Sequence, residues 1–264
     1  MAFMVSIATE AESFPGWDWN DPDGLAPRME AVTESIARCE KLEALPGRVP
    51  VSRRDFLDLG LSGIEFAAFR TAHSEGLGTD LVGVRSPEAA TEPGTVYLVD
   101  GASRFTQLDI CDPLPFEDDC VDWVYAEHLI EHVPMPAASG WLTEVRRILA
   151  PGGVLRITTP DLRNYAAAYV SDGGFFAKHR RRLRMMRLGP PMPERKAFMV
   201  NQIFYLYGHR WIYDLEELRY VLSAAGFDPA AVRRCAFREG ERKDVSDLDV
   251  AFRSDETIYV EVTV

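Results

Sequence analysis

The segment from Leu108 to Asp161 limits the possible folds more strongly than any other part of this sequence. It contains a short apolar run, residues 122–126, and then a pattern from Glu144 to Leu149 with apolar residues on one helical face. Pro151-Gly152-Gly153 ends that helix, because glycine takes the left-handed conformation of a helix C-terminus and proline cannot continue the helix. A second apolar run starts at Val154. The order of strand, helix, turn and strand predicts a βαβ unit.

Short apolar runs alternate with helical patterns along the rest of the chain. The runs are FLDLG (56–60), DLVGV (80–84), TVYLV (95–99), FTQLDI (105–110) and TIYVEVTV (257–264), and the stretch GIEFAAFRTAHSEG (63–76) has a helical pattern. Strands that alternate with helices form largely parallel sheets covered on both faces. We therefore expect an α/β fold: a Rossmann-like, doubly wound, mostly parallel sheet with a C-terminal antiparallel strand.

Two regions depart from this alternation. Residues 1–50 form an N-terminal extension, in which Leu25 to Leu45 have the spacing of an amphipathic helix that packs on the core. Residues 51–264 form the main domain, and its insertion at about 162–208 is a candidate lid. The basic run Lys178 to Arg184 in this insertion predicts a solvated helix face, and the alternative is a grip on an anionic partner.

Composition narrows the classes of partner. A net charge of −12 would repel a phosphate backbone, so nucleic acid is a disfavoured partner. No uncharged apolar stretch approaches the roughly 20 residues of a membrane span. The four cysteines show no CxxC spacing, which favours free thiols in a reducing compartment. We expect a cytoplasmic protein that acts on a small molecule or glycan without a membrane partner, and a homodimer remains open.

The residues LDICDPLPFEDDCVDWVYAEHLIEHV (108–133) and WLTEVRRILAPGGVLRITTPD (141–161) resemble the second half of a class I, S-adenosylmethionine-dependent methyltransferase domain of the type 11-like family. Similar sequences are common among methyltransferases encoded beside enzymes of glycan and polysaccharide biosynthesis. The resemblance implies S-adenosylmethionine as cofactor and O-methylation of a hydroxyl on a saccharide or small molecule. Five aromatic residues would suit stacking on sugar rings, or else belong to the core: Phe204, Tyr205, Tyr207, Trp211 and Tyr213.

The cofactor should lie at the carboxyl ends of the strands, where a doubly wound sheet binds its ligand. Asp109, Ile110 and Glu127 each follow an expected strand and should meet there. In the resembled family, the acid at the position of Asp109 bonds the adenine amino group and the next residue packs on the ring. A carboxylate suits this role because it accepts a hydrogen bond from an exocyclic amine.

The family's first strand ends in a glycine-rich turn after an acid, and the best candidate is Asp58 with Gly60 and Gly63. Glycine lets the backbone approach the methionyl part of the cofactor, and the helix that follows aims its N-terminus at the carboxylate. Leu61-Ser62 replaces the usual middle glycine. The alternative is therefore a non-catalytic binding protein whose cofactor loop has degenerated.

The acid that clasps the ribose hydroxyls should end the second strand. The spacing points to Arg85, which cannot accept hydroxyl protons. We favour Asp100, after the run 95–99, over Asp80 and Glu88.

Methyl transfer from a sulfonium is an in-line displacement, and a hydroxyl acceptor must also lose its proton. His128 and His132 are candidate bases, since both share one helical face with Glu131 by the i, i+3, i+4 rule. His209 is a third candidate, in a later loop that resembles the family's. Purely structural histidines are the alternative, as is RNA or protein methylation that uses the arginine run.

The run 128–132 also resembles the E-x-x-E-H metal motif of ubiquinone-pathway O-methyltransferases, which implies Mg²⁺ at Glu131 and His132. His128 stands in place of the first glutamate, and magnesium prefers oxygen ligands. The replacement weakens the expectation of a magnesium site.

Overall fold

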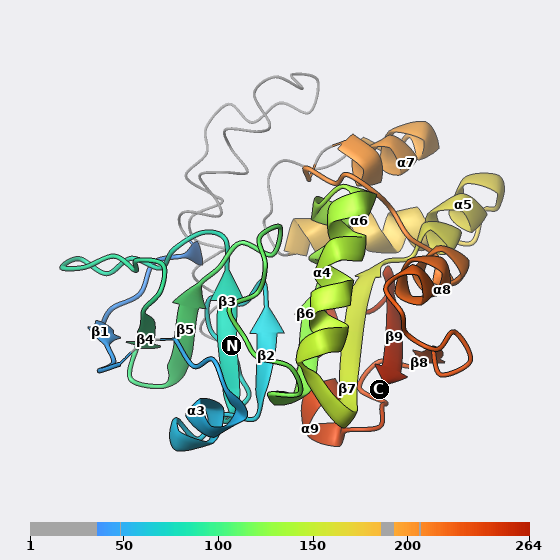
Figure 1. The fold of residues 1–264 in the computed structure, drawn as a ribbon. Coiled ribbons are helices and arrows are strands. Elements are labelled where there is room, and N and C mark those ends of the chain that lie inside the picture. Colours follow the sequence, from blue (N-terminus) through green and yellow to red (C-terminus); the bar gives the residue numbers. More distant parts are fainter. Residues whose placement is uncertain (1–35, 48, 186–192, 206) are drawn as a thin grey trace.

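The computed structural model describes residues 36–47, 49–185, 193–205 and 207–264, which form one mixed sheet with helices packed against it (Figure 1). The strands lie in the order β1-β4-β5-β3-β2-β6-β7-β9-β8. They are β1 (Leu42–Ala44), β2 (Gly63–Phe66), β3 (Gly76–Asp80), β4 (Val96–Val99), β5 (Ser103–Gln107), β6 (Val121–Glu127), β7 (Leu149–Pro160), β8 (Arg233–Cys235) and β9 (Thr257–Thr263).

The helices are α3 (Arg53–Asp58), α4 (Met135–Ile148), α5 (Leu162–Val170), α6 (Phe175–Met185), α7 (Lys196–Tyr205), α8 (Leu215–Ala224) and α9 (Lys243–Ser246). Two single 3-10 turns, η1 (Ile130–His132) and η2 (Ala251–Arg253), complete the described elements. Among these helices, none is long and apolar enough to cross a bilayer.

The centre of the sheet confirms the expected fold class. β5, β3, β2, β6 and β7 are parallel, and β9 lies antiparallel between β7 and β8. The chain starts this parallel core at β2, continues to β3 and β5 on one side, and then crosses to β6 and β7 on the other. The strand order thus reverses between β2 and β6, the place where open α/β sheets bind ligands outside the carboxyl ends of their strands.

One face of the sheet carries the main apolar core. The amphipathic pattern of α4 buries Trp141, Leu142 and Val145 against the sheet, and α8 packs beside α4 on this face (Figure 1). Trp141 meets the ring of Phe66 edge to face at a centroid distance of 5.4 Å. A fully buried side chain of this size contributes about 2–3 kcal/mol of transfer free energy, so α4 holds the sheet in place behind the site.

The other face contains a buried charged network. Side chains alternate along β6, and Trp123 and Tyr125 therefore point away from the main core toward α9. Arg156 of β7 is fully buried on this face and donates to Asp249 (2.6 and 2.8 Å) and Glu261 (2.7 Å). These bonds fasten the segment before β9 to the sheet.

The prediction of a first strand at residues 56–60 is wrong, because residues 53–58 form α3. Ser52 begins this helix: its hydroxyl accepts from the Asp55 amide, and the Asp55 carboxylate accepts from the Ser52 amide. This reciprocal capping stabilises a helix start whatever the β propensity of the residues that follow.

The expected helix at 63–76 is also wrong, because it spans β2, a loop without a helix at 67–75 and the start of β3. Gly63 passes so close to the Trp123 indole that a Cβ there would lie 2.2 Å from it. Pairing with β6 and β3 overrides the local helical pattern. The second strand consequently ends at Asp80 rather than starting there.

The N-terminal extension contributes a strand instead of the end of a helix. Leu42–Ala44 form β1, antiparallel to β4 at the sheet edge, so the predicted helix does not continue to Leu45. The rest of that prediction, up to residue 35, lies outside the described residues.

The insertion after β7 folds into α5, α6 and α7, which lie beyond the carboxyl edge of the sheet (Figure 1). These helices share an apolar cluster of their own around Tyr165, Met199 and Ile203. The cluster supports the insertion as a separate layer above the site.

Candidate functional site

The carboxyl edge of the parallel strands brings together four acids from separate parts of the sequence. Glu65 lies near the end of β2, Asp80 ends β3, Asp109 follows β5 and Glu127 ends β6. Sequence reasoning named Asp109 and Glu127, kept Asp80 only as an alternative and missed Glu65. If residues 63–66 had been recognised as the first strand, Glu65 and Asp80 would both have been identified.

Asp80 occupies the position expected of a ribose-binding acid. Its Oδ1 accepts a hydrogen bond from the Val82 amide at 2.9 Å, which fixes the carboxylate at the end of β3. Burial raises the pKa of Asp80 to about 6, although hydrogen bonds from the Val82 and Leu81 amides oppose the shift. A hydrogen-bonding ligand would relieve part of that desolvation.

Asp100, the favoured ribose acid, lies at the opposite edge, and this choice is corrected. β4 runs antiparallel to β5, so its end falls beside the amino ends of the parallel strands. Asp100 accepts from the amides of Glu40 (2.8 Å) and Lys41 (3.0 Å) and from Arg70 Nε (3.0 Å). Its pKa is lowered: partial burial alone would raise it, but these donors more than compensate. Asp100 anchors β1.

The predicted glycine loop is also displaced to the amino edge. Asp58 ends α3 and forms an exposed ion pair with Arg54, while Gly60 and Gly63 come before β2 rather than after it. At the true end of β2 the turn residue is Ala67, whose φ of 56° lies in the left-handed region that favours glycine. No glycine occurs from residue 64 to 75, and no helix N-terminus follows β2.

The loop after β5 matches its prediction in position. Asp109 is half-buried and accepts from the Cys111 amide at 2.9 Å through Oδ1. Ile110 is half-buried and packs against the main core cluster. One carboxylate and one aliphatic side chain therefore stand together at the carboxyl edge.

Glu127 ends the central strand beside the point where the strand order reverses. The hydroxyl of Tyr125 donates to its Oε2 at 3.2 Å. Burial raises the pKa of Glu127, while Arg253 and His128 oppose the shift.

His128 is placed differently from the prediction. It does not lie on a continuous helix, because the chain forms only the single turn η1 before α4 begins at Met135. His128 itself has φ 50°, a strained value for a residue with a Cβ. Its Nε2 lies 2.9 Å from Thr257 Oγ1, and its Nδ1 lies 3.2 Å from Glu131 Oε1. Both ring nitrogens face protein groups, so the ring links η1 to β9.

Glu131 is fully buried and ionised. Its Oε2 accepts from Thr159 Oγ1 at 2.9 Å, and its main-chain carbonyl accepts from the amides of Arg210 and Trp211. Burial alone would raise the pKa of Glu131, but the interaction with His128 and the nearby imidazoles lower it to about 2.

His132 and His209 meet at the surface end of this cluster. Their rings lie edge to face, 4.8 Å apart between centroids. His209 Nδ1 is hydrogen-bonded to the Ile203 carbonyl, which directs Nε2 away from α7. Burial lowers the pKa of His209, with Glu131 opposing. Protein atoms around the His132 ring likewise exclude water and lower its pKa to about 4, although the residue as a whole is exposed. Both rings are therefore neutral proton acceptors near pH 7.

The donor set does not fit the magnesium ion implied by the E-x-x-E-H motif. One potential ligand atom from each of Glu131, His132 and His209 lies within 4.8 Å of the other two. Two of the three are imidazole nitrogens, whereas Mg²⁺ takes oxygen ligands. We derive no magnesium-dependent step.

The basic run in the insertion is only partly solvated. Arg182 of α6 bonds Glu256 at 2.9 Å and contacts Asp255, and buried His179 lies 3.5 Å from Glu256. Arg180 pairs with Glu194. These contacts fasten α6 to the start of β9, while Lys178, Arg181 and Arg184 are exposed, so the expected solvated face is present only in part.

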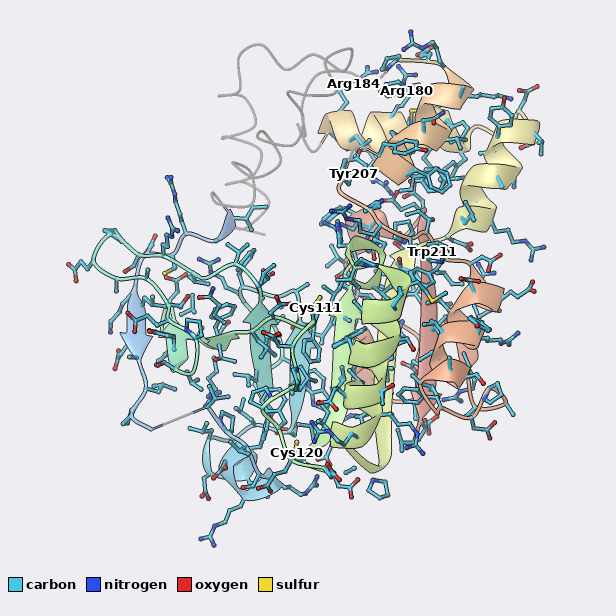
Figure 2. All side chains as sticks on the ribbon, turned by 45° about the horizontal axis from the view of Figure 1, so that its top comes forward. Cys111, Cys120, Arg180, Arg184, Tyr207 and Trp211 are labelled. Carbon is cyan, nitrogen blue, oxygen red and sulfur yellow. The ribbon has the colours of Figure 1, made fainter. Side chains whose placement is uncertain are left out.

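The aromatic residues proposed to stack on sugars differ in their exposure to solvent. Tyr213 is fully buried in the main core. Phe204, Tyr205 and Trp211 are exposed. Figure 2 shows Tyr207 and Trp211 toward the end of the domain where α5, α6 and α7 lie, whereas Cys120 lies at the opposite end.

Residues 57–157 match the family described as a methyltransferase domain, of type 11. No curated protein matches the chain. Similar solved structures include an S-adenosylmethionine-dependent methyltransferase from Mesorhizobium loti (17% identity, 92% of this chain and 100% of that chain covered, TM-score 0.41). Others are SAM-dependent methyltransferases from Archaeoglobus fulgidus (11%, 80% and 90%, 0.41) and Aquifex aeolicus (12%, 81% and 90%, 0.39).

These identities and TM-scores are too low for the solved structures to indicate an acceptor. The family match over residues 57–157 and the reversal of strand order between β2 and β6 together support a class I, S-adenosylmethionine-dependent methyltransferase domain.

Proposed function

We propose that the chain transfers a methyl group from S-adenosylmethionine to a hydroxyl, with the cofactor lying across the carboxyl ends of β5, β3, β2 and β6. The observation that carries this proposal is the placement of Asp109, Asp80 and Glu127 at the carboxyl ends of β5, β3 and β6, along one edge of the sheet. Asp109 and Ile110 would hold the adenine and Asp80 the ribose hydroxyls. The adenine and the ribose would then lie along the edge in the order in which they are joined in the cofactor.

In this proposal, His132 or His209 removes the proton from the acceptor hydroxyl. Hydroxyl acceptors need a base within hydrogen-bond reach, and a neutral imidazole is suited to that role near pH 7. His128 is less suited, because both of its ring nitrogens already face Thr257 and Glu131. Its role is to position Glu131.

The acceptor is proposed to be a saccharide or another small molecule in the cytoplasm. Exposed Tyr205 and Trp211 offer flat apolar surfaces near the lid, and the net charge of −12 disfavours polyanions. Arg180 and Arg182 form ion pairs with acids of this chain, so fewer arginines of the basic run are available to bind an RNA phosphate backbone. The four cysteines are free, which agrees with a reducing compartment.

A second candidate is a binding protein that retains the fold without catalysis. The loop after β2 favours it, since Ala67 stands in the left-handed turn position and residues 67–75 form no helix. Such a loop offers fewer amides to the methionyl carboxylate than a helix N-terminus does.

Calorimetric titration with S-adenosylmethionine separates the two candidates. The proposal expects one cofactor per chain, and transfer of label from methyl-labelled cofactor to hydroxyl-bearing sugars in a panel of acceptors. Absence of binding at millimolar cofactor would remove the enzyme and leave the binding protein. Binding with transfer to nitrogen only would retain the methyltransferase and overturn O-methylation.

A further inference from the structure

Glu131, His132 and His209 form a compact cluster of potential metal ligands between η1 and the loop after α7. One nitrogen or oxygen from each lies within 4.8 Å of the others. An ion that bonds such atoms at about 2.1 Å holds them about 3–4 Å apart. The ligand atoms would therefore have to move closer together when an ion binds.

The surroundings of His209 orient it as a ligand. Its Nδ1 is hydrogen-bonded to the main-chain carbonyl of Ile203, so Nε2 is the nitrogen left for an ion. Histidines that bind metals usually donate their other ring N–H to a carbonyl or carboxylate in this way. The amides of Arg210 and Trp211 bond the Glu131 carbonyl and hold the loop beside η1.

The Glu131 carboxylate provides an independent observation. Its Oε2 accepts from Thr159, but its Oε1 is buried and makes no hydrogen bond within the described part of the chain, although His128 Nδ1 lies 3.2 Å away. A buried carboxylate oxygen that makes no hydrogen bond carries a desolvation cost. A cation beside it would remove that cost.

We propose that Glu131, His132 and His209 bind a first-row transition-metal ion, with Zn²⁺ as the representative, in preference to Mg²⁺. Two imidazoles and one carboxylate are the donor set of catalytic Zn²⁺ and non-haem metal sites that keep coordination positions open for a substrate or water. The site rests on the proposed function in that His132 and His209 are also the proposed bases, but its ligands do not include the residues assigned to S-adenosylmethionine. When bound, the ion supplies a Lewis acid, and the two histidines are then ligands rather than bases.

The test uses the full chain stripped of metal with a chelator and titrated with Co²⁺, whose visible absorption reports imidazole coordination, and with Zn²⁺ by calorimetry. We expect one ion per chain, no displacement of Co²⁺ by excess Mg²⁺, and weaker binding in His132→Ala and His209→Ala. Loss of an outer-shell partner costs about 10- to 100-fold in affinity, and removal of a ligand should cost at least as much. His73→Gln, at the amino edge beside Trp123, is the matched histidine control and should bind normally.

His132 is exposed, so His132→Ala is expected to fold. Affinity for S-adenosylhomocysteine, measured on the same samples, reports both folding and the cofactor site. Absence of Co²⁺ and Zn²⁺ binding, binding unchanged in both alanine variants, or preference for Mg²⁺ would each overturn the metal site. None of these results affects the methyltransferase proposal, which fails instead if cofactor binding is absent from the unaltered chain.

Discussion

Asp80 and Asp100 lie at opposite edges of the same sheet, although each carboxylate follows a strand. Asp80 ends β3 within the parallel core, whereas Asp100 follows β4, which runs the other way. Only Asp80 shares an edge with Asp109 and Glu127. This relationship is the reason we propose Asp80, and not Asp100, as the acid that holds the ribose.

Asp80→Asn should therefore weaken the binding of S-adenosylhomocysteine. The amide accepts the ribose hydroxyl protons without a negative charge, and a loss of about 2 kcal/mol corresponds to about a 30-fold rise in Kd. Isothermal titration measures the change. Asp100→Asn is the matched control: it should lower stability by loosening β1 but leave Kd unchanged, and the reverse pattern would return the ribose to Asp100.

Cofactor affinity should depend on pH through Asp80. Burial raises the pKa of Asp80 to about 6, and only the ionised carboxylate accepts from both ribose hydroxyls. Affinity is thus expected to be constant above pH 6 and to fall by up to about tenfold per pH unit below it. Titrations between about pH 5 and pH 8 measure this, and Asp80→Asn should show no such slope. An equal slope in that variant would assign the titration to another group.

His128 should matter for stability more than for proton transfer. His128→Ala removes the bond to Thr257 and the contact with Glu131, and we expect the free energy of unfolding to fall by about 1–3 kcal/mol. His128→Gly makes the same deletion but relieves the strain of φ 50°, so it should be about 1 kcal/mol more stable than the alanine variant. Denaturant unfolding measures both. Wild-type stability in both variants together with abolished turnover would show that His128 is the base.

The buried and exposed ion pairs should differ sharply in their response to mutation. Asp249→Asn leaves Arg156 without its closest carboxylate in a fully buried site, which should cost about 3–5 kcal/mol. Asp58→Asn breaks only the exposed pair with Arg54, and its effect should stay below about 0.5 kcal/mol. Thermal unfolding compares the two variants.

Asp58→Asn also tests the displaced glycine loop. Because α3 lies at the amino edge, the substitution should leave cofactor affinity unchanged. A large rise in Kd would place the cofactor near α3 after all.

The segment 108–161 could be interpreted without a structure because its strands and helix are dictated locally. β6 and α4 occupy the places that the apolar run and the helical spacing predict, but α4 already ends at Ile148. Pro151-Gly152-Gly153 lies inside β7, which starts at Leu149 rather than at Val154. Asp109 and Glu127 follow directly from those strand ends. The cluster at 128–132 was also recognised, since its members are close in sequence.

Residues 53–100 could not be placed in the same way. The run around Phe56 has β propensity but forms α3, because Ser52 and Asp55 cap a helix there. Residues 63–66 form the first central strand because β3 and β6 pair with them on both sides, and no local pattern records those partners.

The sequence by itself thus determined the fold class, the position of Asp109 and Ile110 at the carboxyl edge and the group of histidines at 128–132. All of these depend on local periodicity and on strand ends next to recognisable helices. Only the tertiary structure decided which acids share an edge, that His209 joins Glu131 and His132, and that His128 faces inward. Strand direction and contacts between distant segments settle such questions, and both arise from pairing across the sheet rather than from neighbouring residues.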